Sequence, residues 1–286
     1  MTSESHASLW SRSYRKFVRD KFGLIGLGVV AIYFVIALAV WMGIIGQNWS
    51  ELLAEGRSSP SSDFWFGTNT NGQDIFARAI FSTKTAFEIG LVVSIVATAL
   101  GGVLGAFAGY LSGTVVDEVI LWLCGCLDCI PFYLFVAAVA FAMKDQPYAM
   151  HISMIATFWM GTCRYIRGEF IKLKHREFVE AAHSVGVKPL KIIFRHIFPN
   201  TWHILIVQAS LTFVLAIKTE VVLSFLGLGV REGVSWGLMI SESVQEVSSG
   251  HFSNFMAASL MMFVLVIAFN MFSDALQDAL DPRKVL

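Results

Sequence analysis

Cysteines and histidines are the side chains of this sequence that could ligate a metal ion. Cys124, Cys126 and Cys129 lie close together, and Cys163 follows later. Thiolates would favour a soft metal, but on a helix Cys124 and Cys126 would point about 200° apart. Because a structural zinc site usually uses CxxC pairs, we expect buried apolar thiols and no metal site.

Two other catalytic motifs are missing from the sequence. It has no HExxH motif that would recruit a hydrolytic zinc ion, so we expect the neighbouring histidines to be solvated or packed at interfaces. It also has no GxxxxGK[ST] phosphate loop, so the chain cannot bind ATP through that motif. We therefore expect a chain that is not an enzyme in isolation. The histidines are His175, His183, His196 and His203.

Asp128 lies inside an apolar run, shortly before Pro131. A carboxylate is costly in lipid, so it should face the interior of a helix bundle or a water-filled path. A structural role and a role in a substrate path are both open. An intramembrane enzyme would need a second catalytic group at matching depth, and the sequence offers Asp128 no obvious partner. Lys218 and Glu220, near the end of a later apolar run, could extend to the membrane interface.

Composition indicates a membrane protein. Of the 286 residues, 56% are hydrophobic and 15% are charged, whereas soluble domains average about 45–50% and about 25%. The mean hydropathy is +0.65. The formal net charge is zero, so no global field favours nucleic acid as a partner.

Six stretches are apolar over roughly 20 residues, the length of a helix that crosses a bilayer. We therefore expect an all-α membrane protein with six transmembrane helices. His151, Thr157 and Arg164 dilute the apolar character of the fourth stretch. The stretches cover residues 22–45, 85–111, 119–143, 148–166, 202–225 and 252–272.

Lysine and arginine gather on one side of these predicted spans. They concentrate in the N-terminal arm 1–21, between the fourth and fifth spans, and in the C-terminal tail 276–286. Basic segments are retained in the cytoplasm. We therefore expect both termini in the cytoplasm and a periplasmic loop at 46–84.

A polar stretch, EFVEAAHSVGVKPLKIIFRHIFPN at 177–200, separates the fourth and fifth spans. On a helix, its apolar residues at i, i+3, i+4 and i+7 would form one face. Small alanine side chains in that face would let another protein approach closely. The face could be a docking surface, or it could cover the bundle while basic residues meet lipid phosphates. Its members are Phe178, Ala181, Ala182 and Val185.

Glycine and proline divide this stretch into two predicted helices. Gly186 suits the left-handed residue that follows a helix, and Pro189 can open the second helix. Pro199 would close that helix, and Asn200 would cap the fifth span. We expect a short helix, a sharp turn and a second helix along the membrane surface.

Several sequence motifs follow one another along the chain. EAA at 180–182 is followed by Gly186 and by HIFPN from His196; the others are FGTNTNGQD with Arg78, AGYLSGTVVDE, LSFLGLG and SDALQDALDPR. Together they resemble the dipeptide/oligopeptide/nickel permease family of ATP-binding-cassette (ABC) importers, from about Phe64 to the C-terminus. The resemblance implies a type I ABC importer permease fold with a cytoplasmic coupling helix.

The resemblance also implies partners and a site. In that family the EAA helix is seated in a cleft of an ATPase. The implied partners are a homologous second permease, one or two ATPase subunits that bind ATP, an extracytoplasmic solute-binding protein and membrane lipid. The implied location is the bacterial inner membrane, and the implied cargo is short peptides, with nickel or other small solutes open. The implied ATPase-coupling residues are Phe178, Glu180, Ala181, Ala182, Val185 and Gly186.

The expected organisation follows from these spans and motifs. A first transmembrane helix at 22–45 precedes the loop 46–84, and a permease core of five transmembrane helices occupies 85–275. The core includes the EAA loop 167–200. The alternative is a secondary transporter driven by an ion gradient, which would need charged or broken helices near the bilayer midplane.

Two further patterns bear on packing. Asn69 and Gln73 stand where the family usually has Asp and Arg, so the family's ion-pair roles are not transferred to them. A stripe of small residues at four-residue spacing permits close helix contact with a span of this chain or of the partner permease. The stripe consists of Ala97, Gly101, Gly105 and Gly109. The resemblance also implies a packing role for Glu220, which precedes the SFLGLG segment, as the alternative to extension to the interface.

Overall fold

The computed structural model describes residues 9–280 and is helical, apart from turns, loops and an isolated bridge between Thr68 and Asp74. Residues 1–8 and 281–286, which include the predicted basic residues Arg283 and Lys284 of the tail, lie outside the described residues. The chain forms two compact units. Of the described residues, one unit contains 9–90 and 214–280, and the other contains Leu91–Phe213.

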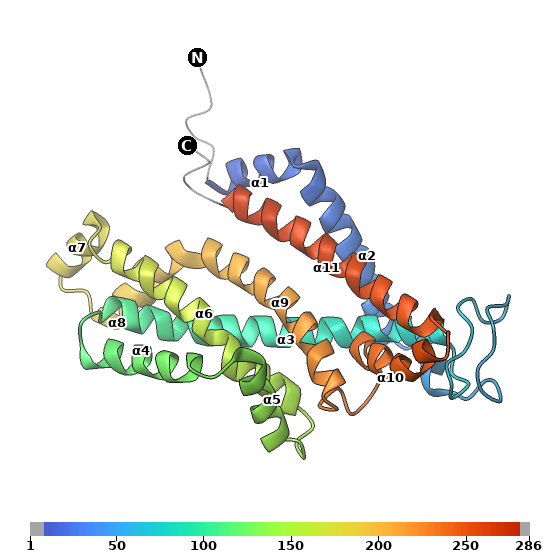
Figure 1. The fold of residues 1–286 in the computed structure, drawn as a ribbon. Coiled ribbons are helices and arrows are strands. Elements are labelled where there is room, and N and C mark those ends of the chain that lie inside the picture. Colours follow the sequence, from blue (N-terminus) through green and yellow to red (C-terminus); the bar gives the residue numbers. More distant parts are fainter. Residues whose placement is uncertain (1–8, 281–286) are drawn as a thin grey trace. The chain divides into compact units, whose positions relative to one another are not determined.

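In the first unit, α2 packs lengthwise against α11 (Figure 1). A Cβ on Gly26 would lie 2.5 Å from the carbonyl oxygen of Ala268, so only glycine permits this approach. The Tyr33 hydroxyl donates to the Met261 carbonyl at 3.1 Å. The elements of this unit are α1 (Leu9–Arg19), α2 (Lys21–Trp41), η1 (Gln47–Ser50), the start of α3 (Ile75–Tyr110), the end of α9 (Trp202–Phe225), α10 (Trp236–Ser248) and α11 (Ser253–Leu280).

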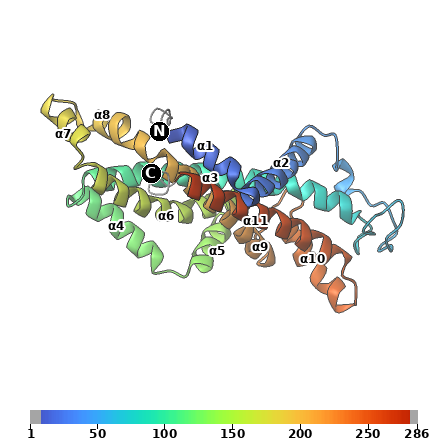
Figure 2. The ribbon, with the colours of Figure 1, turned by 90° about the horizontal axis from the view of Figure 1, so that it is seen from above.

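The second unit places the short helix α7 at one end, as both views show (Figure 2). The remainder of α3 and the first part of α9 belong to this unit. Its other elements are α4 (Val115–Asp128), α5 (Phe132–Ala142), α6 (Ala149–Leu173), α7 (Glu177–Ser184), α8 (Pro189–Lys191), η2 (Ile192–Ile197) and η3 (Phe198–Thr201).

The glycine stripe of α3 packs against α6 of the same chain. A Cβ on Gly105 would lie 3.0 Å from the Cβ of Ile166, and one on Gly109 would lie 2.6 Å from the carbonyl oxygen of Arg167. The missing side chains therefore let the two helix backbones approach closely. The sequence left open whether the stripe packs against a span of this chain or of a partner permease. In the structure it packs against a span of this chain, α6.

Among the described residues, four helices are long and apolar enough to cross a membrane, or five if the bent pair α4 and α5 counts as one span. The four are Lys21–Trp41, Ile75–Tyr110, Pro189–Phe225 and Ser253–Leu280. α6 covers the predicted fourth span but does not meet this test, so the number six stays a prediction.

The predicted third span, 119–143, is wrong as a single straight helix. α4 ends at Asp128, α5 begins at Phe132, and the two helices are bent by 93°. Pro131 precedes α5 with φ −54° and ψ 128°, which is not helical. Proline lacks a backbone N–H and disfavours a helical residue before it, so the helix ends there.

The predicted helix end at Pro199 is also wrong. The backbone passes from α8 through a π-helical turn, η2, and a 3₁₀ turn, η3, directly into α9. Pro199 stands in the first turn of η3, where its missing N–H is tolerated. Asn200 donates through Nδ2 to the His196 carbonyl at 2.7 Å instead of capping α9.

Candidate functional site

The helix α7 carries the EAA residues, and its ends are defined by local backbone chemistry. Glu177 and Glu180 lie in the first turn, where the helix dipole favours acidic side chains. After the last turn, Gly186 has φ +76° and donates to the His183 carbonyl at 2.9 Å. Val187 donates to the Ala182 carbonyl at 3.1 Å. These two bonds form a Schellman motif, and they confirm Gly186 as the left-handed residue that ends the helix.

One side of α7 is buried in its own chain. Val179 is 0% exposed and Ala182 is 6% exposed. Together they pack into an apolar core contributed by α3, α6, η2 and α9. The other members of this core are Ala106, Ile166, Phe170, Ile192, Ile193, Ile197 and Leu205.

The opposite side of α7 is open. Phe178 is 42% exposed, Val185 is 79% exposed, and Ala181 is also exposed. We call Phe178, Ala181 and Val185 the exposed face of α7. This placement corrects the expected four-residue face, because Ala182 shares the buried side with Val179, three residues before it. Glu180 is exposed beside the open face.

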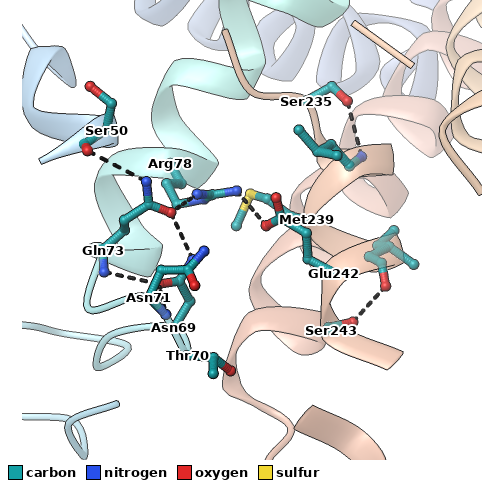
Figure 3. Close-up of polar contacts among 12 residues, drawn as sticks. Ser50, Asn69, Thr70, Asn71, Gln73, Arg78, Ser235, Met239, Glu242 and Ser243 are labelled. Atoms are coloured by element: carbon teal, nitrogen blue, oxygen red, sulfur yellow. Dashed lines mark hydrogen bonds and ion pairs between the residues drawn. The ribbon is translucent and has the colours of Figure 1, made fainter. Parts of the chain in front are cut away.

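In the other unit, a polar cluster surrounds Arg78 at the start of α3 (Figure 3). Arg78 is 3% exposed and donates through Nη2 to Oε2 of Glu242 in α10 at 2.5 Å. Gln73 Oε1 accepts from Arg78 Nη1 and, at 2.9 Å, from Asn69 Nδ2. The uncharged residues Asn69 and Gln73 therefore form an amide pair that also supplies an acceptor to Arg78.

α10 provides two acidic residues to this cluster. Burial raises the pKa of the Glu242 carboxyl, Arg78 opposes that rise, and Glu246 adds to it. Glu246 Oε1 accepts from the backbone N–H of Thr70 at 2.9 Å and from its hydroxyl at 2.8 Å. Arg78 thereby fastens the first turn of α3 to α10, and Thr70 fastens the loop before α3 to the same helix. Sequence reasoning missed Glu242, although Glu242 and Glu246 at i and i+4 mark one acidic helix face.

Of the two roles left open for Glu220, packing inside the protein is the one observed, and extension to an interface is not. Glu220 is 5% exposed, and its Oε1 accepts from the hydroxyls of Ser224 and Ser235 at 2.5 Å each. A Cβ on Gly237 would lie 2.6 Å from Glu220 Oε2, so a glycine there makes room for the carboxylate. These hydroxyl partners allow the acid to remain inside the protein.

Asp128 forms an ion pair with Arg164 of α6, a partner that the sequence did not reveal. The two side chains are 41% and 49% exposed. Asp128 is the last residue of α4, where the helix dipole disfavours an acid, and Arg164 offsets that cost. The pair therefore gives the carboxylate a structural explanation and leaves it accessible.

The cysteines and histidines do not assemble into a metal site within residues 9–280, where no group of three or more candidate ligands is placed to hold an ion. Cys124 and Cys163 are buried and pack with Trp159 and Met160. Cys126 and Cys129 are exposed, so the expectation of buried thiols is wrong for these two. Among the histidines, His183 contacts Tyr110, with 3.2 Å between Nε2 and the hydroxyl.

Residues 101–285 match the family of the binding-protein-dependent transport system inner membrane component. The chain belongs to this family. It is 31% identical over 278 residues to the dipeptide transport system permease protein DppC of Bacillus subtilis, covering 95% of this chain and 85% of that protein. It is 30% identical over 282 residues to the oligopeptide permease protein OppC of the same organism, covering 98% and 92%.

A third relative is the glutathione transport system permease protein GsiD of Pectobacterium atrosepticum, 34% identical over 284 residues and covering 96% of this chain and 91% of that protein. This permease is thus an integral subunit of an ABC importer and a multi-pass membrane protein, as its apolar helices require. The family assignment gives no support to the ion-gradient-driven alternative.

Proposed function

We propose that this permease moves short peptides across the bacterial cytoplasmic membrane as the non-catalytic subunit of an ATP-driven importer. Partner ATPase subunits bind and hydrolyse ATP, and one of them docks on the exposed face of α7. The observation that carries this proposal is the division of α7 into a buried and an open side. The buried side anchors the helix, and Phe178, Ala181 and Val185 stay available.

The chemistry of the exposed face suits a protein partner. Phe178 and Val185 offer apolar surface, and Ala181 between them is small enough for a partner to approach the helix backbone. Burial of aromatic and aliphatic anchors supplies most of the binding energy in protein interfaces. Gly186 then turns the chain sharply away from the face, so the following segment leaves room for a cleft to enclose the helix.

Anchoring allows α7 to transmit movement. Val179 and Ala182 pack against residues of α3, α6, η2 and α9, so a displacement of α7 is resisted by those elements and passes to them. ATP binding would favour one arrangement of the ATPase and therefore one position of α7. Alternating access would follow as the permease halves shift between two arrangements.

Peptide cargo rests on the relatives. Their names specify dipeptide, oligopeptide and glutathione transport, and all three solutes are short peptides or a peptide derivative. Nickel or another small solute is the alternative cargo. Specificity would be shared with an extracytoplasmic solute-binding protein and with residues that line the path.

The remaining partners and the orientation complete the proposal. A homologous second permease would line the substrate path together with this chain. One or two kinds of ATPase subunit would bind to the cytoplasmic side of the two permeases. The basic residues between the predicted fourth and fifth spans support a cytoplasmic location for α7, and those of the two terminal segments support one for both termini. The apolar outer surface of the spans would contact lipid, and no nucleic acid is involved.

Asp128 is a candidate residue of the substrate path. It is charged, 41% exposed and located where α4 gives way to the bend before α5. A path role predicts that Asp128→Asn raises the KM for peptide uptake, whereas Arg164→Gln, which breaks the same ion pair, does not. An equal change of KM in both variants would show that the ion pair has a structural role only.

The experiment that tests the proposal is uptake by the reconstituted importer. The permease, its second permease, the ATPases and the binding protein are placed in lipid vesicles, and labelled dipeptides and oligopeptides are supplied with their binding protein. We expect uptake that requires ATP on the ATPase side. Uptake driven by an ion gradient without ATP, or uptake of nickel with no uptake of peptide, would overturn the corresponding part of the proposal.

A further inference from the structure

The turn between α3 and α4 contacts the end of α6 and the last turn of α7. Three residues around this turn each bond to a residue of α6, its C-cap or α7. Tyr110 contacts His183, Ser112 accepts from Lys174, and Asp117 pairs with Arg167. We call Tyr110, Ser112 and Asp117 the α3–α4 strap.

Asp117 makes the strongest of these contacts. It is 3% exposed, and both of its oxygens accept from one guanidinium: Arg167 Nε donates to Oδ1 at 2.6 Å and Nη2 donates to Oδ2 at 2.8 Å. The backbone N–H of Gly113 donates to Oδ2 at 3.0 Å. A bidentate pair fixes both distance and orientation. Asp117 therefore holds the first turn of α4 against α6.

The other two contacts lie next to α7 itself. Lys174, the C-cap residue of α6, donates through Nζ to Ser112 Oγ. His183, in the last turn of α7, stacks on Tyr110 with ring centroids 6.2 Å apart and an interplanar angle of 13°. The strap thus bonds to the chain just before α7 begins and again where α7 ends.

Apolar packing alone would not fix the direction in which α7 moves. Val179 and Ala182 contact the core with small aliphatic side chains, and such contacts are not directional. The bonds of the strap are directional. Tyr110 joins α7 to α3 directly, whereas Ser112 and Asp117 join the turn and α4 to α6, the helix that leads into α7. The backbones of α3 and α6 are already in close contact at Gly105 and Gly109.

We propose that the α3–α4 strap positions α7 for coupling. Displacement of α7 by the ATPase is then passed through Tyr110 to α3 and, by way of α6, from Arg167 through Asp117 to α4. This inference rests on the proposed docking of an ATPase at α7. The strap residues touch neither ATP nor cargo and act as positioning residues. His183, which had no explained role inside the EAA segment, receives one as the contact of α7 with Tyr110.

Loss of the strap has a distinctive consequence. The apolar core still holds α7 and the exposed face is unchanged, so the ATPase still binds and hydrolyses ATP. The movement of α7 then reaches α4 less effectively, and fewer solute molecules cross for each ATP. Residues that carry such coupling alter it by a few-fold up to roughly 30-fold.

The test uses the complete importer in vesicles and three variants, Asp117→Asn, Arg167→Lys and Tyr110→Phe. ATPase content, ATP hydrolysis and labelled peptide uptake are measured on the same vesicles. We expect unchanged ATPase content and an uptake per ATP that falls about threefold or more in Asp117→Asn, less in Arg167→Lys, which keeps the charge, and least in Tyr110→Phe. Because Asp117 and Arg167 act as a pair, the double variant should be no worse than the more damaging single variant.

Two results would overturn the inference. One is an unchanged uptake per ATP in all three variants. The other is a fall in ATPase content that accounts for all of the lost uptake, which would make the strap merely structural. Tyr110→Phe removes only the contact of one exposed hydroxyl. It therefore still tests the inference if Asp117→Asn fails to insert into the membrane. Failure of the proposed function looks different, because the wild-type permease itself would then retain no ATPase.

Discussion

Val179 and Val185 belong to the same short segment, yet Val179 is 0% exposed and Val185 is 79% exposed. The first lies in the apolar core beneath α7, and the second lies at the helix C-cap on the exposed face. Two identical side chains thus separate the anchoring of α7 from the proposed docking of a partner.

This separation predicts different effects of the same truncation. Val179→Ala should lower the free energy of unfolding by about 2 kcal/mol, because it removes two methyl groups from a packed core. Val185→Ala should change it by less than about 0.5 kcal/mol. Chemical denaturation of both variants in mixed micelles measures the difference, and equal losses would show that α7 is not anchored as described.

The cost of replacing Gly186 should depend on how readily the new residue adopts the left-handed backbone conformation. Its φ is +76°, and a Cβ added there meets no atom within 4 Å, so strain and not collision sets the cost. Gly186→Ala should destabilise the permease by about 1 kcal/mol, and Gly186→Asn by less, since asparagine adopts the left-handed conformation more readily. The midpoints of chemical unfolding of the two variants measure which one is less stable. Equal damage by both residues would point to a cause other than the backbone.

The amide pair near Arg78 predicts that the family's arginine is harmful here unless its acid returns as well. Gln73→Arg brings a second guanidinium against buried Arg78 and removes the acceptor Oε1, so it should cost about 1–2 kcal/mol. Adding Asn69→Asp should recover at least half of that loss. The stability of the two single variants and the double variant forms the test, and a strictly additive double variant would contradict the pairing.

Local sequence signals predicted the part of the site that depends on a few consecutive residues. Gly186 was identified as the end of α7 because a left-handed residue is strongly selected at that position, and Pro189 does open α8. The helical spacing also located an apolar face, but Val179 with Ala182 and Phe178 with Ala181 fit the period equally well. Periodicity alone could not decide which pair faces the core.

Contacts between distant parts of the chain could not be predicted. Asp128 and Arg164 pair only because α4 and α6 lie together, and the glycine stripe of α3 could have served any neighbouring helix until Ile166 and Arg167 were found against it. The strap residue Asp117 belonged to a recognised motif, yet nothing in that motif named Arg167 as its partner.

Two prolines show why the helix boundaries were only partly predictable. Pro131 ends a helix and accompanies a bend of 93°, whereas Pro199 lies within a continuous helical path. The difference lies in the backbone before each proline. A π-helical turn, Ile192–Ile197, precedes Pro199, and such a turn locally relaxes the hydrogen-bond ladder. Sequence reasoning had no signal for that turn.

The central claim is that an ATPase docks on the exposed face of α7, and its most direct test is retention of the ATPase by the tagged permease in mild detergent. Val185→Glu is compared with Val115→Glu, a matched change at a position of α4 that is 72% exposed. We predict about tenfold less ATPase on Val185→Glu at equal permease abundance, and an undiminished amount on Val115→Glu. Equal ATPase retention by wild type and Val185→Glu would contradict the account.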